Sequence, residues 1–191
     1  LALGLLAVGC DEGADAEPNP AAADAAVDAA APEDAAVEAE VDPISAALEC
    51  EAQNLALPPL QGPGIEDGVF AEPLPEGAVI SGTVLFLMEG EEPGQVFLDL
   101  MTPILGAMNA SEGLIGQALT FDLDCGIART FTVWRDLQSM YDFVGSEAHV
   151  AAIARWSEFS RPESAVVHWD HEPGAPPPTW QDAIDRANAA E

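Results

Sequence analysis

His149 is the residue whose type and position best suit acid–base chemistry in this chain. It follows Ser146, a good helix N-cap, so the imidazole falls in the first turn of a predicted helix. The positive end of the helix dipole favours the neutral imidazole. A neutral histidine in an apolar pocket is suited to accept a proton from a substrate or to ligate haem. We therefore name His149 as the candidate catalytic residue. The alternative, and the more common case, is a partly buried histidine with a structural role.

Tryptophan and arginine side chains supply candidates for ligand binding. Trp134, Trp156 and Trp169 have the size to wall a cavity for a small apolar or aromatic ligand, although tryptophans more often fill a core. Arg129 is one of only five basic residues in the chain, and we name it as a candidate for an anionic group of a ligand. The alternative for Arg129 is an ion pair with a nearby acid.

His168 and His171 form a close pair in the sequence HWDH, within a predicted strand. Residues i and i+3 of a strand point to opposite faces of the sheet, so this pair is a weak candidate for a shared metal ion. The sequence also has no CxxC, P-loop, GxGxxG, GxSxG or HExxH motif. We therefore predict no metal site and no cofactor.

Cys10 ends an apolar run that resembles the end of a bacterial lipoprotein signal peptide. Residues 1–9 are apolar or Gly, and they are too few to span a bilayer as a helix, which needs about 20 residues. The sequence AVGC ending at Cys10 resembles a lipobox, with the expected Leu one position early, at Leu6. We predict that residues 1–9 are a signal-peptide remnant and that Cys10 is lipidated. A short buried strand with an incidental Cys is the alternative.

An acidic, alanine-rich segment follows at residues 11–42. It contains no aromatic residue, Leu or basic residue, and its prolines interrupt any long helix. With so little apolar surface to bury, it has the composition of a disordered segment. We therefore predict that residues 10–42 are a lipidated Cys and an acidic tether, which would hold the protein in the cell envelope, attached to a bacterial membrane.

The net charge of −29 excludes two classes of interaction. A nucleic-acid-binding protein needs a basic surface, and attachment to anionic lipid headgroups needs a cluster of basic residues. This sequence has no Lys and only five Arg. We predict no nucleic-acid partner, and a membrane attachment through the lipid on Cys10.

Two further cysteines, Cys50 and Cys125, have two interpretations. An exported protein folds where disulfides persist, so the two residues are candidates for a bridge. They are equally candidates for two separate buried thiols, because a sequence does not give the distance between two Cα atoms.

The rest of the chain alternates between helix and strand patterns. Residues 43–57 have apolar positions at helical spacing and residues 58–77 are rich in Pro and Gly, so we predict a helix-and-loop lead-in over 43–77. A folded domain follows over 78–191. Its predicted elements are a strand at 78–89, a helix at 91–113, strands at 114–124 and 128–135, helices at 136–144 and 146–159, a strand at 164–172 and a terminal helix. This order is the ferredoxin-like split βαβ arrangement, an α+β fold.

The strand at 78–89 is apolar on both faces. We expect all helices to cover one face of the four-stranded sheet and to leave the other face apolar and open. A contiguous apolar face of this kind usually has a partner. We therefore predict a homodimer that pairs sheet against sheet. A monomer would need another cover for that face, such as the helix at 43–57.

The segment from Gly113 to Ile153 resembles a known family. One strand ends in the sequence TFTVW, and an acidic helix start, a Phe-Val pair and an Ala-His pair follow it, at Thr130, Thr132, Val133, Trp134, Asp136, Phe143, Val144, Ala148 and His149. Together with the later strand and terminal helix, these features are similar to an uncharacterised branch of the antibiotic-biosynthesis-monooxygenase-like dimeric α/β barrels. The resemblance covers residues 78–187.

The resemblance implies a dimeric α/β barrel and leaves the function open. The superfamily includes cofactor-free monooxygenases, haem-handling enzymes, isomerase-like proteins and members without known activity. Outside the cytoplasm an enzyme lacks ready access to NADH or flavin pools, which favours cofactor-free chemistry or plain binding. One hypothesis is a lipid-anchored module that binds a small molecule or serves a structural role. The other is a cofactor-independent monooxygenase acting on a small aromatic or polyketide-like substrate.

Overall fold

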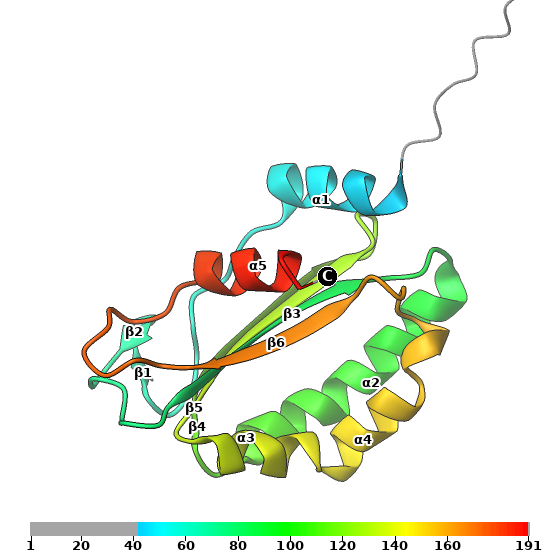
Figure 1. Ribbon diagram of the computed structural model, residues 1–191. Helices are drawn as coiled ribbons and strands as arrows, with labels where there is room; N and C mark the ends of the chain where they lie inside the picture. Colours follow the sequence, from blue (N-terminus) through cyan, green and yellow to red (C-terminus); the bar gives the residue numbers. More distant parts are fainter. Residues whose placement is uncertain (1–41, 191) are drawn as a thin grey trace, which may run out of the picture. The chain divides into compact units, whose positions relative to one another are not determined.

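The structure is a computed structural model that describes residues 42–190 (Figure 1). It begins with helix α1, Pro43–Asn54, and ends with helix α5, Trp180–Asn188. The predicted signal-peptide remnant, the predicted lipidation of Cys10 and the predicted tether up to position 41 lie outside the described residues.

The core of the fold is a four-stranded antiparallel sheet with the strand order β4-β5-β3-β6. The strands are β3 (Val79–Phe86), β4 (Leu114–Asp122), β5 (Ile127–Trp134) and β6 (Ala165–Asp170). Three helices connect them: α2 (Glu91–Ala110) between β3 and β4, then α3 (Leu137–Val144) and α4 (Glu147–Ala154) between β5 and β6. The α+β class and the ferredoxin-like order predicted from the sequence are therefore confirmed.

Short polar side chains set the boundaries around the segment that carries His149. The Asp136 carboxylate accepts a hydrogen bond from the Ser139 backbone N–H at 2.7 Å and begins α3. The Ser146 hydroxyl accepts one from the His149 backbone N–H at 3.4 Å and begins α4. The helix predicted to run to 159 ends at Ala154, and a 3₁₀ turn, Trp156–Glu158, follows it. These caps place His149 in the first turn of its helix.

Helices α2, α3 and α4 cover one face of the sheet, which we call the first face (Figure 1). Leu85 and Ala128 of the sheet pack there against Phe97 of α2 and Ala152 of α4. Trp134 packs against α3 in the same layer. Side chains alternate along each strand, so the first face takes every second residue of β3 and β5.

The opposite, second face of the sheet is not open, and this part of the prediction was wrong. Helices α1 and α5 lie over it, together with the lead-in, which contains the small hairpin of β1 (Ile65–Glu66) and β2 (Val69–Phe70) (Figure 1). Ile80, Val84 and Val133 on this face are at most 1% exposed. The apolar surface expected to pair two copies is therefore buried within one chain. The homodimer predicted from the sequence therefore lacks the open face that motivated it, and a measurement of mass in solution would test it.

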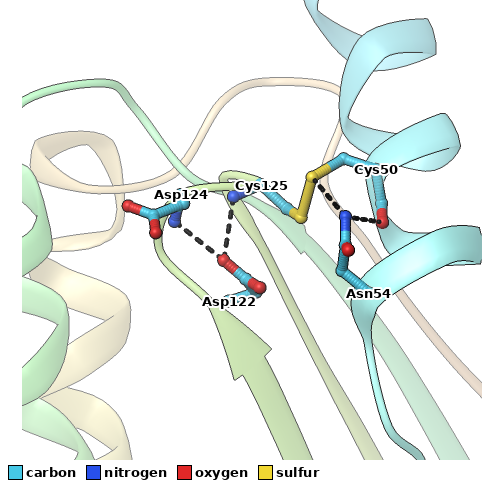
Figure 2. Close-up of a disulfide and its surroundings, with 5 residues drawn as sticks. All are labelled: Cys50, Asn54, Asp122, Asp124 and Cys125. Atoms are coloured by element: carbon cyan, nitrogen blue, oxygen red, sulfur yellow. Dashed lines mark hydrogen bonds between the residues drawn. A yellow bond between two sulfur atoms is a disulfide. The ribbon is translucent and has the colours of Figure 1, made fainter.

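A disulfide bond fastens α1 to the sheet (Figure 2). Cys50 of α1 is bonded to Cys125 in the β4–β5 turn, with 5.5 Å between the two Cα atoms. The turn itself is shaped by Asp122, whose carboxylate accepts hydrogen bonds from the backbone N–H groups of Asp124 and Cys125 at 2.9 and 3.0 Å. Gly126 completes it with a φ of 65°.

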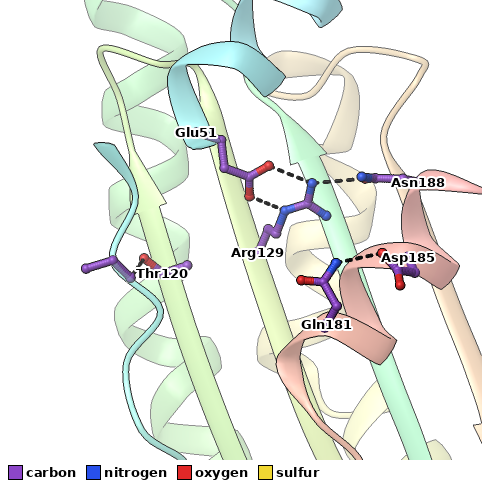
Figure 3. A network of polar contacts seen from close by, with 7 residues as sticks. Glu51, Thr120, Arg129, Gln181, Asp185 and Asn188 are labelled. Carbon is purple, nitrogen blue, oxygen red and sulfur yellow. Dashed lines mark hydrogen bonds and ion pairs between the residues drawn. The ribbon is translucent and has the colours of Figure 1, made fainter. Parts of the chain in front are cut away.

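A buried ion pair also connects helix α1 to the sheet (Figure 3). Arg129 of β5 is 1% exposed and forms a two-pronged ion pair with Glu51 of α1, in which one contact, from Nη2 to Oε2, measures 2.8 Å. The same Nη2 donates to Asn188 of α5 at 2.9 Å. Arg129 therefore joins α1, the sheet and α5 on the second face.

Candidate functional site

A cavity of about 380 Å³ lies between the first face of the sheet and helices α2, α3 and α4. This volume is in the range of small-molecule sites, roughly 300–1,000 Å³. Apolar side chains of the three helices form most of its walls, namely Met101, Ile104, Leu105, Met108, Met140, Phe143, Val144, Ala152 and Ile153. The cavity is therefore a concave, largely apolar site.

The floor of the cavity is a row of polar side chains across all four strands. Ser81 of β3 lies directly between Thr132 of β5 and His168 of β6, and Gln117 of β4 lies opposite Thr132. Thr83 and Thr130 are cross-strand partners in the next row. The register of the sheet thus gathers polar groups from four distant segments onto one wall.

Most of these floor groups have no hydrogen-bond partner within residues 42–190. Among the described residues, only the Thr132 hydroxyl is engaged, accepting from the Trp134 indole N–H at 2.9 Å. The side chains of Ser81, Thr83, Gln117 and Thr130 form no hydrogen bond within residues 42–190. Buried or half-buried polar groups normally find a partner, so these groups are available to a ligand or to water.

The cavity is free of formal charge. Of the described residues that line it, none is Asp, Glu, Lys or Arg. This is unusual for a chain with a net charge of −29. An ionised group would lose its hydration on entering such a site and gain no counter-charge, so the site favours neutral molecules.

His149 reaches the cavity from α4, and its ring packs edge-to-face on Phe143 with 4.9 Å between ring centroids. The buried Nδ1 atom has no hydrogen-bond partner among the described residues. Burial lowers the pKa of His149 below its usual 6.5, and a weaker polar contact with the Val144 backbone acts in the opposite direction. His149 is therefore a neutral base beside the cavity at pH 7.

Trp134 and Trp156 line the same cavity. Trp134 is 1% exposed and stacks on Phe143, with ring centroids 5.3 Å apart, so it is also part of the core. Trp156 lies in the 3₁₀ turn after α4 and packs against Phe159 at 5.9 Å between centroids. The structure thus brings together three of the residues singled out from the sequence: His149, Trp134 and Trp156.

The cavity opens between the edge strand β6 and helices α3 and α4. Tyr141 of α3 and His168 of β6 both line the cavity and pack edge-to-face at its rim, with ring centroids 6.4 Å apart. Ile153 of α4 and Val166 of β6 complete the rim and are 51% and 58% exposed. Tyr141 is 49% exposed, so it borders the mouth of the cavity.

Two other ligand-binding candidates from the sequence, Arg129 and Trp169, do not lie in this cavity. Both lie on the second face, where Arg129 is paired with Glu51 and Trp169 lies beneath the guanidinium of Arg186, 4.7 Å from its ring centroid. The physical reason is the two-residue period of a strand, which sends Arg129 and Thr130, or His168 and Trp169, to opposite faces. Arg129 is therefore unable to meet a ligand in the cavity.

Two further findings concern the part of the chain that the structure describes. Within residues 42–190, no three His, Cys, Asp or Glu side chains are grouped closely enough to hold a metal ion. None of the helices described there is both long enough and apolar enough to cross a membrane.

The polar floor was missed by the reasoning from sequence, although two signals for it were present. Thr130, Thr132 and Trp134 alternate with apolar residues along one strand. Ser81 and Thr83 are small polar residues at alternate positions of an otherwise apolar strand. Polar residues on a face that helices cover indicate a cavity, because a dry interface there would leave their hydroxyl groups without partners.

No family model and no curated protein match this sequence. Among solved structures, it is similar to Rv0793 from Mycobacterium tuberculosis, with a TM-score of 0.45 and 16% identity over 55% of this chain and 99% of that one. For SnoaB, a cofactor-independent oxygenase from Streptomyces nogalater, the TM-score is 0.42 and the identity 12%, over 53% and 99%. For a conserved protein from Methanosarcina mazei Go1 they are 0.43 and 18%, over 50% and 93%. With TM-scores below 0.5, these likenesses carry no conclusion about the function of this chain.

Proposed function

We propose that this protein is a lipid-anchored binding protein of the bacterial cell envelope, whose cavity takes a small, neutral, largely apolar ring compound. One observation carries the proposal: an uncharged cavity of about 380 Å³ with unpaired hydroxyl and amide groups along one wall. The apolar helices would cover the faces of the ligand, and the floor would bind polar groups along one of its edges. The envelope location and the anchor rest on the lipobox-like sequence at Cys10.

A matched pair of fluorescent probes tests this proposal. N-phenyl-1-naphthylamine is neutral, and 8-anilino-1-naphthalenesulfonate is the same molecule with one sulfonate added. We expect the neutral probe to bind with a rise in fluorescence and the sulfonate to bind at least tenfold more weakly, because its charge would be desolvated. Equal affinity for both probes would contradict a neutral-ligand site.

Two alanines on α4 provide the matched variants for the same measurement. Ala152 lines the cavity and is 7% exposed, whereas Ala151 is exposed on the other side of the helix. Ala152→Phe should fill the cavity and abolish probe binding, and Ala151→Phe should leave it unchanged. Binding that survives Ala152→Phe would place the probe elsewhere on the protein.

A second candidate function is cofactor-independent oxygenation, with His149 as the base. The observation that favours it is the neutral imidazole beside a cavity large enough for a ring compound. His149 would accept a proton from an activated ring CH₂ group, and the resulting carbanion would pass electrons to O₂. One oxygen atom of O₂ would convert the CH₂ group to C=O, and the other would leave as water with the two hydrogens. The reaction balances without a cofactor.

Oxygen uptake with a hydroxylated anthrone as the probe substrate tests this second candidate. Uptake by the full chain that falls at least 100-fold in His149→Gln, with binding of the neutral probe retained, would support it. Uptake at the rate of the protein-free control, in a protein that binds the neutral probe, would leave plain binding as the function.

A further inference from the structure

Helix α4 is exceptional in this acidic protein because it is apolar on its solvent side as well as on its cavity side. Residues 148–154, AHVAAIA, contain no charged residue. Val150 and Ile153 are each 51% exposed, and Ala151 and Ala154 are exposed too. A surface helix normally turns charged residues to water and apolar residues to the core. The outer side of α4 therefore has the composition of a surface that contacts something apolar.

This exposed surface continues around the mouth of the cavity. Ten large apolar side chains are exposed within residues 42–190, and half of them lie on α3, α4 and β6. We call this set the mouth patch: Leu137, Tyr141, Val150, Ile153 and Val166. Tyr141, Ile153 and Val166 line the cavity as well, so the patch includes the exposed part of the cavity wall. A contiguous apolar surface of this kind usually marks an interaction site.

The charges near the patch exclude an anionic partner surface. The charged residues of α3 and α4 are Asp142 and Glu147, both acidic. The arginines that flank these helices, Arg135 and Arg155, are each paired with an acid, Asp136 and Glu158, so they leave no net positive charge beside the patch. Basic residues are what attract a protein to anionic lipid. An uncharged apolar patch that carries a tyrosine at its edge fits the interface of a neutral lipid layer, where aromatic residues with one polar end are enriched.

The same chain supplies a reason for a lipid layer to be close by. Cys10, the predicted lipidation site, precedes the described residues, which begin at position 42. A lipid on Cys10 would hold the domain at a high local concentration next to a bilayer, so docking that is weak in free solution would suffice.

We propose that the mouth patch docks on the surface of a neutral lipid bilayer, so that the cavity opens toward the membrane. The proposal rests on the proposed function for its purpose, because an apolar ligand partitions into membranes and would enter the cavity without crossing water. The docking itself needs no ligand, so it is tested separately from ligand binding.

The experiment uses the full chain attached to phosphatidylcholine vesicles through Cys10. Cys50 and Cys125 are bonded to each other, so Cys10 is the one thiol left for coupling to a maleimide lipid. Hydrogen–deuterium exchange is then compared between vesicle-bound and free protein. We expect exchange in residues 137–154 to slow by at least threefold on vesicles, while exchange in α1 and α5 stays unchanged. Unchanged exchange in 137–154 would overturn the proposal.

Substitutions at Val150 and Val69 separate docking from other effects. Val150 belongs to the patch without lining the cavity, and Val69 in β2 is 63% exposed on the other side of the sheet. Val150→Asp and Val150→Lys should both abolish the protection, because either charge resists burial in neutral lipid. Val69→Asp should retain it, and all three variants should bind the neutral probe in solution. If the wild-type chain does not bind the neutral probe, the proposed function is refuted, but the docking result is unaffected.

Two outcomes would assign the patch to another partner. Protection of residues 137–154 that grows with protein concentration in the absence of vesicles would mean that a second copy covers the patch. Protection that survives Val150→Asp would mean that α4 is covered by contacts other than burial in lipid. Either result would overturn the proposal.

Discussion

The imidazole of His149 is held in an apolar environment that lowers its pKa. In the unfolded chain its pKa returns to 6.5, so the unfolded state binds more protons between the two values. The contribution of His149 to folding is therefore complete above pH 6.5 and is lost as the pH falls below it. This behaviour distinguishes a buried neutral histidine from a solvated one.

The test at this scale is the thermal midpoint of the wild type and of His149→Gln between pH 5 and 8. Above pH 6.5 the difference between the two midpoints should be constant. Below it the wild type should lose stability relative to the variant. Only the wild type has an imidazole that the unfolded state protonates more readily than the folded state does, and this proton uptake favours unfolding. Parallel curves over the whole range would show that the imidazole is solvated in the folded protein.

Arg129 and Glu51 form the second residue-scale case, because they are 1% and 12% exposed in their side chains. Glu51→Gln should lower the free energy of unfolding by about 3–5 kcal/mol, since it leaves a buried guanidinium without its counter-charge. Replacing both residues, Arg129→Met with Glu51→Leu, should recover most of that loss. Urea unfolding of the two variants measures the difference, and a double variant as unstable as the single one would contradict the pairing.

At the scale of elements, the close approach of α5 to β3 decides how the second face is covered. A Cβ added at Gly82 would lie 3.0 Å from the Cβ of Ala183 and 3.1 Å from its carbonyl oxygen. Helix α5 can therefore lie directly on the sheet only because β3 has no side chain at this position.

Two glycine substitutions with opposite expected effects test this packing. Gly82→Ala should lower the free energy of unfolding by about 1–3 kcal/mol through overpacking. Gly106→Ala should raise it by roughly 0.5–1 kcal/mol, because Gly106 lies within α2 with nothing within 4 Å of an added Cβ. Chemical denaturation measures both changes. An unchanged free energy of unfolding in Gly82→Ala would mean that α5 is not packed closely on β3.

For the whole molecule, the disulfide connects two parts that are distant in sequence. It joins α1 to the sheet across a sequence separation of 75 residues. Replacing both cysteines, Cys50→Ser with Cys125→Ser, should lower the free energy of unfolding by about 4 kcal/mol on the chain-entropy estimate. Urea unfolding of the two proteins checks this, and equal midpoints would show that α1 is held by its other contacts alone.

The covering of the second face also bears on the oligomeric state of the protein. With α1 and α5 in place, the sheet has no free face for a second copy. Light scattering on the disulfide-bonded chain at micromolar concentration should therefore report the monomer mass of 19.9 kDa. Twice this mass would support the homodimer predicted from the sequence and would show that it uses a different surface, such as the mouth patch.

The sequence by itself determined the order of the elements and the local features around the candidate base. The strand and helix periods and the caps at Asp136 and Ser146 are properties of short segments, so they can be read without knowing the rest of the fold. For the same reason the sequence placed His149 correctly in the first turn of a helix. The net charge of −29 predicted that there is no nucleic-acid partner, and the lipobox-like sequence at Cys10 predicted a location outside the cytoplasm. Both remain predictions.

Only the tertiary structure decided which side chains meet. The polar floor joins Ser81, Gln117, Thr132 and His168 through strand register, which depends on pairings between segments far apart in the chain. The same register sent Arg129 and Trp169 to the other face. Whether α1 and α5 cover that face depends on Gly82, on the Glu51–Arg129 pair and on the disulfide, all of which are contacts over long sequence separations. A pattern within one segment carries no information about such contacts, and for that reason the open face was predicted wrongly.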